Sequence, residues 1–258
     1  MQTLILCGGM GTRLREETEY RPKPMVEIGG RPILWHIMKG YATRGFTEFV
    51  LCLGYKGDRI KEYFLNYEAM NHDLTLELGR QGAVHYHGGH EEDGWRVTLV
   101  DTGLQTMTGA RIRRAARHLR GDTFMVTYGD GLSDLNVGDL VAFHRRTGAV
   151  GTVTGVRPSS RFGELVTVGS RVVQFSEKPR TTEGLINGGF FVFDRRFLDY
   201  LSDDPACVLE REPLERLAAD GLLQVYRHEG FWQCMDTYRD HQLLTQLWES
   251  GQAPWRCW

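Results

Sequence analysis

Apolar runs of strand length alternate with stretches of helical spacing through the first 150 residues of the chain. The predicted strands cover residues 3–7, 48–53, 74–78 and 123–128. Between them, apolar residues recur at intervals of three and four in the segments 34–41, 60–67 and 112–119, and Thr108 is the expected N-cap of the third helix. This alternation is typical of β-α-β units. It predicts an α/β fold with a mainly parallel sheet flanked by helices.

The pattern changes between residues 149 and 194, where apolar runs lie close together and Gly, Pro and Ser separate them. The runs at 150–156, 165–168, 172–175 and 190–193 predict strands, which we interpret as hairpins added beside the sheet. Helical spacing returns at 214–218 and 243–248. No Pro-, Gly- or Ser-rich linker isolates a second domain, so the prediction is one domain over residues 1–258 with a helical C-terminal tail.

The tail is rich in tryptophan. Four of the six tryptophans lie within its last residues: Trp232, Trp248, Trp255 and Trp258. Such a concentration of aromatic side chains is not expected of a frayed terminus. We therefore expect the tail to pack on the body of its own chain or on another subunit.

Composition and charge disfavour several classes of protein. The chain has 258 residues, 41% of them hydrophobic, which is enough for a sizeable core. Lys plus Arg is 31 and Asp plus Glu is 33, a balance that disfavours nucleic acid as a partner. No apolar run approaches the roughly 20 residues that span a bilayer, and no signal-peptide pattern precedes Gly8. The expectation is a cytoplasmic protein with no membrane partner.

The five cysteines are odd in number and scattered, with no C-x-x-C spacing. This usage fits reduced, buried thiols better than a disulfide framework or a zinc site.

A glycine-rich turn, Gly8-Gly9-Met10-Gly11-Thr12-Arg13, follows the first predicted strand. Backbone N–H groups in such a turn can converge on a phosphate or a nucleotide. The dinucleotide fingerprint fails because Leu14 stands where its third Gly or Ala is needed, and the Walker spacing is also absent. A nicotinamide-dependent oxidoreductase is therefore disfavoured, while an ordinary structural turn stays an open alternative.

Lys23 lies between Pro22 and Pro24. The two prolines predict an extended segment of low conformational entropy, which would fix the ammonium group. A fixed ammonium suits a phosphoryl oxygen, and the planar guanidinium of Arg13 can bind a phosphate through two nitrogens.

Asp130 and Asp236 stand at predicted turns, and Asp130 directly follows a buried strand. Mg²⁺ typically takes one or two such carboxylates together with substrate phosphates. A turn or capping role is the alternative for each residue. The loops after two later strands add Glu177 and Asn187, which can bind sugar hydroxyls, and Lys178, which can neutralise a sugar phosphate.

His85, His87 and His90 lie in a stretch, residues 79–96, that matches no motif. Histidines two residues apart share one face of a strand, which is compatible with a transition-metal site. A polar surface hairpin is the favoured interpretation, and we expect no catalytic part for it.

Taken in order, these segments resemble the sugar nucleotidyltransferase (NDP-sugar pyrophosphorylase) family. The resemblance is carried by LILCGGMGTRL (4–14), RPKPMVEIGGRPILWHI (21–37), YGDG (128–131), FSEKP (175–179) and INGGFFVF (186–193). It covers essentially the whole chain. Within the family, the segments VTLVDTGLQTMTGARIRR (97–114), RFGEL (161–165), GFWQCMDT (230–237) and GQAPWRCW (251–258) are most similar to glucose-1-phosphate cytidylyltransferases.

The resemblance implies a Rossmann-like sheet with a nucleotide-binding part at 1–148, a β-rich sugar-binding insertion at 149–200, and a segment at 201–258 that holds a metal ligand and the tail. It implies an enzyme that converts CTP and a sugar 1-phosphate, by default α-D-glucose 1-phosphate, to a CDP-sugar and pyrophosphate with Mg²⁺. The alternatives are UTP or dTTP as the nucleotide, or a relative that binds nucleotide sugars without catalysis. A homo-oligomer is also expected.

The resemblance further implies roles by position. The catalytic residues would be Arg13, Lys23 and Asp130, and the metal ligands Asp130 and Asp236. The substrate-binding residues would be Leu6, Cys7, Gly8, Gly9, Met10, Gly11, Thr12, Arg13, Lys23, Thr106, Arg111, Gly129, Glu177, Lys178, Asn187 and Gly188. Cys7 stands where relatives have Ala, a change of little consequence because both side chains are small and apolar.

Overall fold

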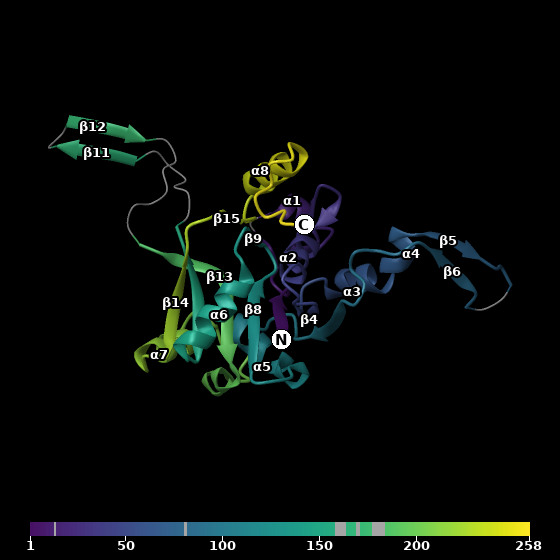
Figure 1. The fold of residues 1–258 in the computed structure, drawn as a ribbon, viewed down its shortest axis with the longest axis horizontal. Coiled ribbons are helices and arrows are strands. Elements are labelled where there is room, and N and C mark those ends of the chain that lie inside the picture. The colour runs from purple at the N-terminus through teal and green to yellow at the C-terminus, as the bar shows by residue number, and fades with distance from the viewer. Residues whose placement is uncertain (13, 80–81, 158–163, 169–170, 177–183) are drawn as a thin grey trace.

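A computed structural model describes residues 1–12, 14–79, 82–157, 164–168, 171–176 and 184–258. Its centre is a seven-stranded sheet in the order β14-β10-β13-β8-β1-β4-β7 (Figure 1). The strands are β1 (Gln2–Leu6), β4 (Glu48–Leu53), β7 (Arg96–Asp101), β8 (Thr123–Tyr128), β10 (Gly151–Val156), β13 (Ile186–Asp194) and β14 (Leu223–His228). Of these seven, β13 alone runs antiparallel to its neighbours β8 and β10. The predicted mainly parallel α/β sheet is confirmed.

Helices cover both faces of the sheet. The α-helices are α1 (Arg15–Thr18), α2 (Ile33–Ala42), α3 (Gly57–Leu65), α4 (Tyr67–Asn71), α5 (Thr108–Ala115), α6 (Val137–Thr147), α7 (Glu212–Ala219) and α8 (Tyr238–Glu249). Short 3₁₀ helices are η1 (Lys23–Met25), η2 (Ala116–His118) and η3 (Arg195–Tyr200). In β1, Ile5 contributes to one core cluster with α2 and α6, whereas Leu4 and Leu6 contribute to a second with α5 and α7. Alternate side chains of a strand point to opposite faces, so both faces are buried.

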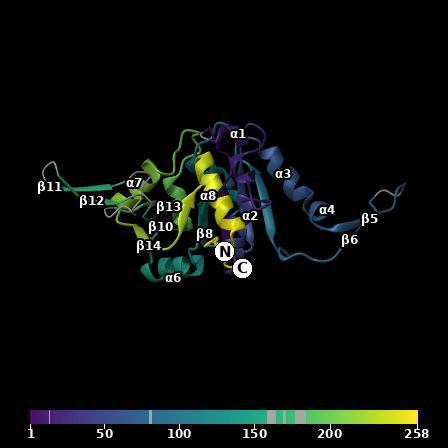
Figure 2. The same ribbon diagram turned by 90° about the horizontal axis from the view of Figure 1, so that it is seen from above.

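Among the described residues, four two-stranded ribbons flank the sheet. They are β2 (Glu27–Ile28) with β3 (Arg31–Pro32), β5 (Asp73–Leu76) with β6 (Val84–His87), β9 (Gly131–Ser133) with β15 (Trp232–Cys234), and β11 (Glu164–Val168) with β12 (Arg171–Ser176). The ribbons β5–β6 and β11–β12 project on opposite sides of the molecule (Figures 1 and 2). Prediction placed all the runs between 149 and 194 in hairpins beside the sheet, which is wrong for β10 and β13. Both are strands of the central sheet.

Three local predictions also need correction. The strand expected at 74–78 is β5, which belongs to the outlying antiparallel ribbon β5–β6 and not to the central sheet. Thr108 is not the N-cap of α5: Met107 holds that position, and the Thr108 hydroxyl instead donates to Glu210 at 2.7 Å. The helical segment at 60–67 is two helices, because α3 ends at Leu65 and α4 begins at Tyr67.

The C-terminal tail packs on the body of its own chain. Trp255 is 2% exposed, and the rings of Trp248, Trp255 and Trp258 surround His36 on α2. This contact confirms the expectation for the tail. All five cysteines are free thiols; Cys7 and Cys52 are buried, while Cys257 is exposed, so burial was predicted correctly for only part of the set. Among the residues that the structure describes, no helix has the length and apolar character needed to cross a membrane.

Candidate active site

A cavity of about 450 Å³ opens at the carboxyl ends of the central strands β1 and β8. The carboxyl edge of a parallel sheet is where an α/β protein presents loops to a ligand. Most of the residues expected to bind substrate or metal line this cavity: Leu6, Cys7, Gly8, Gly9, Gly11, Thr12, Lys23, Thr106, Arg111, Gly129, Asp130 and Asp236. Met10 does not line it and is 43% exposed.

Asp130 and Asp236 converge on Lys23. The Lys23 Nζ atom lies 2.6 Å from Asp130 Oδ2 and 2.7 Å from Asp236 Oδ1. The three side chains are only 13%, 24% and 23% exposed, in the order Lys23, Asp130, Asp236. These are short, charge-assisted contacts in a partly desolvated site, where they are stronger than at an open surface.

The ribbon β9–β15 brings the two aspartates together. Asp130 precedes β9 and Asp236 follows β15, and the antiparallel pairing sets Gly131 opposite Cys234. The Met235 amide then donates to the Asp130 carbonyl at 2.9 Å. The ribbon, whose two strands have three residues each, therefore brings together two acids that lie more than a hundred residues apart in the sequence.

Lys23 begins the 3₁₀ turn η1 rather than lying in an extended segment, so that expectation is wrong. The Met25 amide donates to the Pro22 carbonyl at 2.8 Å, and the Val26 amide donates to the Lys23 carbonyl at 3.1 Å. Pro24 fits because its missing N–H is not needed at the start of a helical turn. The turn fixes the backbone of Lys23 by hydrogen bonds as well as by the flanking prolines.

Electrostatics keep this site charged. Burial alone would lower the pKa of Lys23, but the Asp130 and Asp236 carboxylates outweigh burial and raise that pKa above its ordinary value. Cys234 lies beside the two acids, and burial followed by the Asp130 charge raises the pKa of its thiol. The raised pKa favours the protonated thiol at neutral pH, and sulfur is a soft ligand that a hard cation such as Mg²⁺ does not favour.

The donor set fits a hard divalent cation. Ligand atoms of Asp130, Cys234 and Asp236 lie within 4.8 Å of one another. With the thiol protonated, the two carboxylates supply the oxygen ligands that Mg²⁺ prefers. A lysine already neutralises part of their charge, so an incoming cation must compete with the Lys23 ammonium for the same oxygens.

Arg111 lines the cavity, but its guanidinium is committed to the protein. The residue is 4% exposed. It donates at 2.7–3.3 Å to the carbonyl oxygens of Gly8, Leu53, Gly103 and Leu104 and to the Thr102 hydroxyl. Thr106 is held in a similar way, because Arg114 Nη1 donates to its hydroxyl at 2.8 Å. These two arginines brace the loops that form the cavity wall.

The remaining predicted residues lie beside the cavity or outside the described chain. Asn187 Nδ2 donates to the hydroxyl of the lining residue Tyr128 at 3.3 Å, so Asn187 borders the cavity wall. The Gly188 carbonyl accepts from Trp232 Nε1 at 2.7 Å, a side chain that does not line the cavity. Arg13, Glu177 and Lys178 lie outside the described residues.

Sequence analysis missed several residues of the wall: Pro24, Met107, Thr108, Tyr128 and Cys234. Tyr128 is the last residue of β8, and its place next to Gly129 is a signal that could have identified it. Its hydroxyl donates to Glu210. Glu210 carries no sequence signal of its own, since its loop reaches the cavity only through tertiary packing.

Comparisons with known proteins identify the family and the fold. Residues 2–233 match the Nucleotidyl transferase family. The chain is 48% identical over 259 aligned residues to the glucose-1-phosphate cytidylyltransferase of Salmonella typhi, with 100% of both chains covered. Among solved structures, HddC from Yersinia pseudotuberculosis aligns with a TM-score of 0.70 at 22% identity, covering 96% of this chain and 99% of its own. A UDP-glucose pyrophosphorylase complexed with UDP-glucose aligns with a TM-score of 0.68 at 13% identity, covering 97% and 98%. The two structures share the fold, and the chain belongs to the nucleotidyl transferase family.

Proposed function

We propose that the protein transfers a cytidylyl group from CTP to α-D-glucose 1-phosphate, giving CDP-glucose and pyrophosphate. One observation carries the proposal: Lys23, Asp130 and Asp236 meet in a cavity beside a glycine turn. The full-length similarity to a glucose-1-phosphate cytidylyltransferase supports the choice of nucleotide and sugar.

The reaction joins two anions. An oxygen of the sugar phosphate attacks the α-phosphorus of the nucleotide, the bond between the α-phosphorus and its bridging oxygen breaks, and pyrophosphate leaves. No covalent enzyme intermediate is required, so the protein positions the reactants and neutralises charge. The turn from Gly8 to Thr12 lies where its backbone can approach the nucleotide phosphates.

Asp130 and Asp236 would hold Mg²⁺. When bound, the ion would withdraw charge from the phosphate oxygens and stabilise the leaving pyrophosphate. The carboxylates suit this role because they are the charged oxygen donors of the site and already hold a cation in place.

Lys23 would hold the α-phosphate. Its ammonium carries three N–H donors and now uses two of them on carboxylates. Phosphate oxygens are anionic acceptors of the same kind, so the ammonium can exchange one set for the other without losing its charge. The pKa of Lys23 is raised, which keeps it a cation throughout.

The described residues suggest a revised role for Arg111. The resemblance placed it on the nucleotide, whereas its terminal nitrogens all donate to the protein. We assign it to shaping the turn at Gly8 and the segment at Gly103. Roles for Arg13 on the departing pyrophosphate, Lys178 on the sugar phosphate, and Glu177 with Asn187 on sugar hydroxyls stay predictions. A homo-oligomer likewise stays a prediction, which light scattering on the purified protein would test.

A pyrophosphate-release assay tests the proposal. CTP, UTP and dTTP would each be offered with glucose 1-phosphate and other sugar 1-phosphates in excess Mg²⁺. We expect the highest kcat/KM for CTP with glucose 1-phosphate. A preference for UTP or dTTP would overturn the nucleotide assignment. Binding of nucleotide sugars without turnover of any pair would show a non-catalytic relative.

A further inference from the structure

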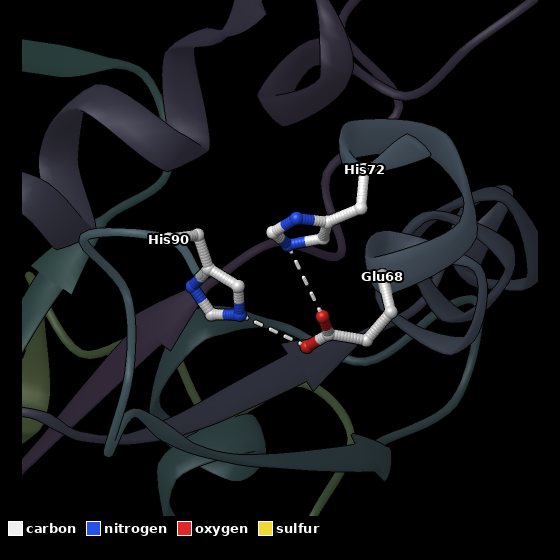
Figure 3. Close-up of side chains that lie close together, drawn as sticks. All are labelled: Glu68, His72 and His90. Atoms are coloured by element: carbon white, nitrogen blue, oxygen red, sulfur yellow. Dashed lines mark hydrogen bonds and ion pairs between the residues drawn. The ribbon is translucent and has the colours of Figure 1, made fainter. Parts of the chain in front are cut away.

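The histidine-rich stretch singled out in the sequence is divided by the fold. His85 and His87 lie on the exposed strand β6 with ring centroids 4.6 Å apart. His90 lies beyond that strand and faces a different element, the short helix α4 and the residue that ends it. Figure 3 shows the carboxylate of Glu68 between the imidazoles of His72 and His90. One ring nitrogen of His72 faces one carboxylate oxygen, and one ring nitrogen of His90 faces the other.

We propose that Glu68, His72 and His90 form a binding site for a transition-metal ion of the Zn²⁺ class. Their candidate ligand atoms lie within 4.8 Å of one another. His90 Nε2 is 2.9 Å from Glu68 Oε1, and His72 Nε2 is 3.3 Å from Glu68 Oε2. Two ligand atoms on one tetrahedral zinc ion lie about 3.3 Å apart, given bonds of about 2.0–2.1 Å. The separation between His72 Nε2 and Glu68 Oε2, 3.3 Å, equals that value, whereas His90 Nε2 and Glu68 Oε1, at 2.9 Å, now form a hydrogen bond and would move slightly apart.

The state of His72 points independently to a ligand. Its side chain is only 6% exposed, and its Nε2 atom is buried with no hydrogen-bond partner among the described residues. Glu68 Oε2 faces it at 3.3 Å, within ion-pair distance but without hydrogen-bond geometry. A buried ring nitrogen without a partner is unfavourable. A metal ion bound among the three side chains would be coordinated by the lone pair of His72 Nε2.

A carboxylate that could orient a ligating ring lies beside His90, although the ring now holds its proton on the nitrogen that faces Glu68. A ligating histidine usually donates its other ring N–H to a carboxylate or carbonyl oxygen. The Glu92 carboxylate lies 3.4 Å from His90 Nδ1 and is itself fixed by Trp35 Nε1 and Lys39 Nζ, each at 3.1 Å. The Glu92 amide now donates to that same Nδ1 at 3.1 Å, so metal binding at Nε2 requires the proton to move to Nδ1 and this contact to loosen.

The three proposed ligands do not complete the coordination of a tetrahedral ion. Three protein ligands leave a fourth position for water or another side chain. Asp93 Oδ1 lies 3.6 Å from His90 Nε2, and the Asp93 side chain is 81% exposed, so it is free to approach. Two imidazoles with carboxylates favour zinc over Mg²⁺ or Ca²⁺, which prefer oxygen ligands alone.

Such an ion would join α4 to the segment after the β5–β6 ribbon. None of the three ligands lines the active-site cavity. The ribbon projects away from the sheet in Figure 1, and the region that anchors it is where the ion would lie. The site is therefore structural in this proposal, and its failure would leave the proposed catalytic function untouched.

Calorimetric titration of EDTA-stripped protein with Zn²⁺ in excess Mg²⁺ tests the site. The same titration in the Asp130→Asn/Asp236→Asn variant separates it from the acids of the active site. We expect one equivalent of Zn²⁺ per chain in both, with a higher melting temperature when Zn²⁺ is bound. Glu68→Gln and His90→Gln should each bind Zn²⁺ at least about tenfold more weakly and should lose that rise in melting temperature. Glu68 is 51% exposed, so its replacement should not prevent folding.

His85→Gln/His87→Gln is the matched control, because it removes two neighbouring histidines and leaves the proposed ligands. Zn²⁺ binding in this variant should equal that of the wild type. The proposal is overturned if the wild type shows no saturable binding below about 10 μM. It is equally overturned if Glu68→Gln binds as tightly as the wild type, or if the control variant loses the ion.

Discussion

The guanidinium of Arg111 fills the space where a side chain at Gly8 would begin. A Cβ atom built on Gly8 would lie 2.1 Å from Arg111 Nη1, and Arg111 Nη2 donates to the Gly8 carbonyl at 3.1 Å. The glycine turn is thus shaped by an arginine from α5, a helix about a hundred residues later in the chain. Because the guanidinium donates to five acceptors, displacing it would break several buried hydrogen bonds.

Replacing Gly8 with alanine should therefore damage both stability and activity. The new Cβ would displace Arg111 and leave buried carbonyl oxygens without donors, each costing about 1–3 kcal/mol. We expect Gly8→Ala to lose at least about 2 kcal/mol of unfolding free energy and most of its kcat/KM. Gly9→Ala is the matched control, since nothing lies within 4 Å of a Cβ there. A melting temperature for Gly8→Ala equal to that of Gly9→Ala would contradict this reasoning.

Lys23→Ala should separate catalysis from metal binding. The substitution removes the ammonium assigned to the α-phosphate, and loss of one preorganised donor costs about 3–4 kcal/mol, or 100- to 1,000-fold in kcat. It also removes the cation that competes for Asp130 and Asp236, so Mg²⁺ should bind at least as tightly as before. Turnover by pyrophosphate release and Mg²⁺ affinity by calorimetry measure the two effects. Lys61→Ala, which removes an exposed lysine, should change neither.

Asp130→Asn should weaken Mg²⁺ binding, unlike Lys23→Ala. Asparagine keeps the shape of the side chain but removes its charge, so both Mg²⁺ affinity and kcat should fall, the latter by at least about 100-fold. The exposed Asp139→Asn controls for the loss of one negative charge. Near-normal turnover of Asp130→Asn would remove this carboxylate from the mechanism. Asp236→Asn should resemble Asp130→Asn, because both hold the same ammonium.

Much of the sheet could be predicted because its strands are buried on both faces. Residues 48–53 and 123–128 read as continuous apolar runs, and the structure places strands at those bounds. Several elements were missed, among them β14, an edge strand of the central sheet whose residues are all exposed or partly exposed. The edge strand β7 is only partly buried, so its apolar run is weaker, and α6 has an apolar stripe at Val137, Leu140 and Val141 that could have been read. The antiparallel direction of β13 depends on packing that no local pattern records.

The convergence of the active-site acids could not be predicted in the same way. Sequence placed Asp130 and Asp236 at turns, but their meeting depends on β9 and β15, strands of three residues each. Pairing of such short segments is decided by the surrounding fold rather than by their own propensity. The arrangement of Arg111 is similar. The resemblance placed it on the nucleotide, whereas its guanidinium is buried among carbonyl oxygens of the protein.

His36 should make stability depend on pH. It lies 1% exposed among the tryptophans of the tail, donates through Nε2 to the Ile28 carbonyl at 2.8 Å and accepts at Nδ1 from Trp255 Nε1 at 3.4 Å. These contacts specify the neutral ring. Burial lowers the pKa of His36 from 6.5 to about 4. The unfolded chain therefore binds a proton between these values that the folded chain does not, and stability is lost as pH falls through that window.

Urea unfolding of the wild type and of His36→Gln would measure this effect. From about pH 7.5 to about pH 5, the wild type should lose about 2 kcal/mol more than the variant, because glutamine does not titrate. The variant is less stable at every pH, since it loses the aromatic contacts of the ring. The quantity compared is therefore the slope of the unfolding free energy against pH and not the unfolding free energy itself. His87→Gln, on the exposed strand β6, should keep the wild-type slope. Equal slopes for the wild type and His36→Gln would show that the buried ring is protonated at little cost.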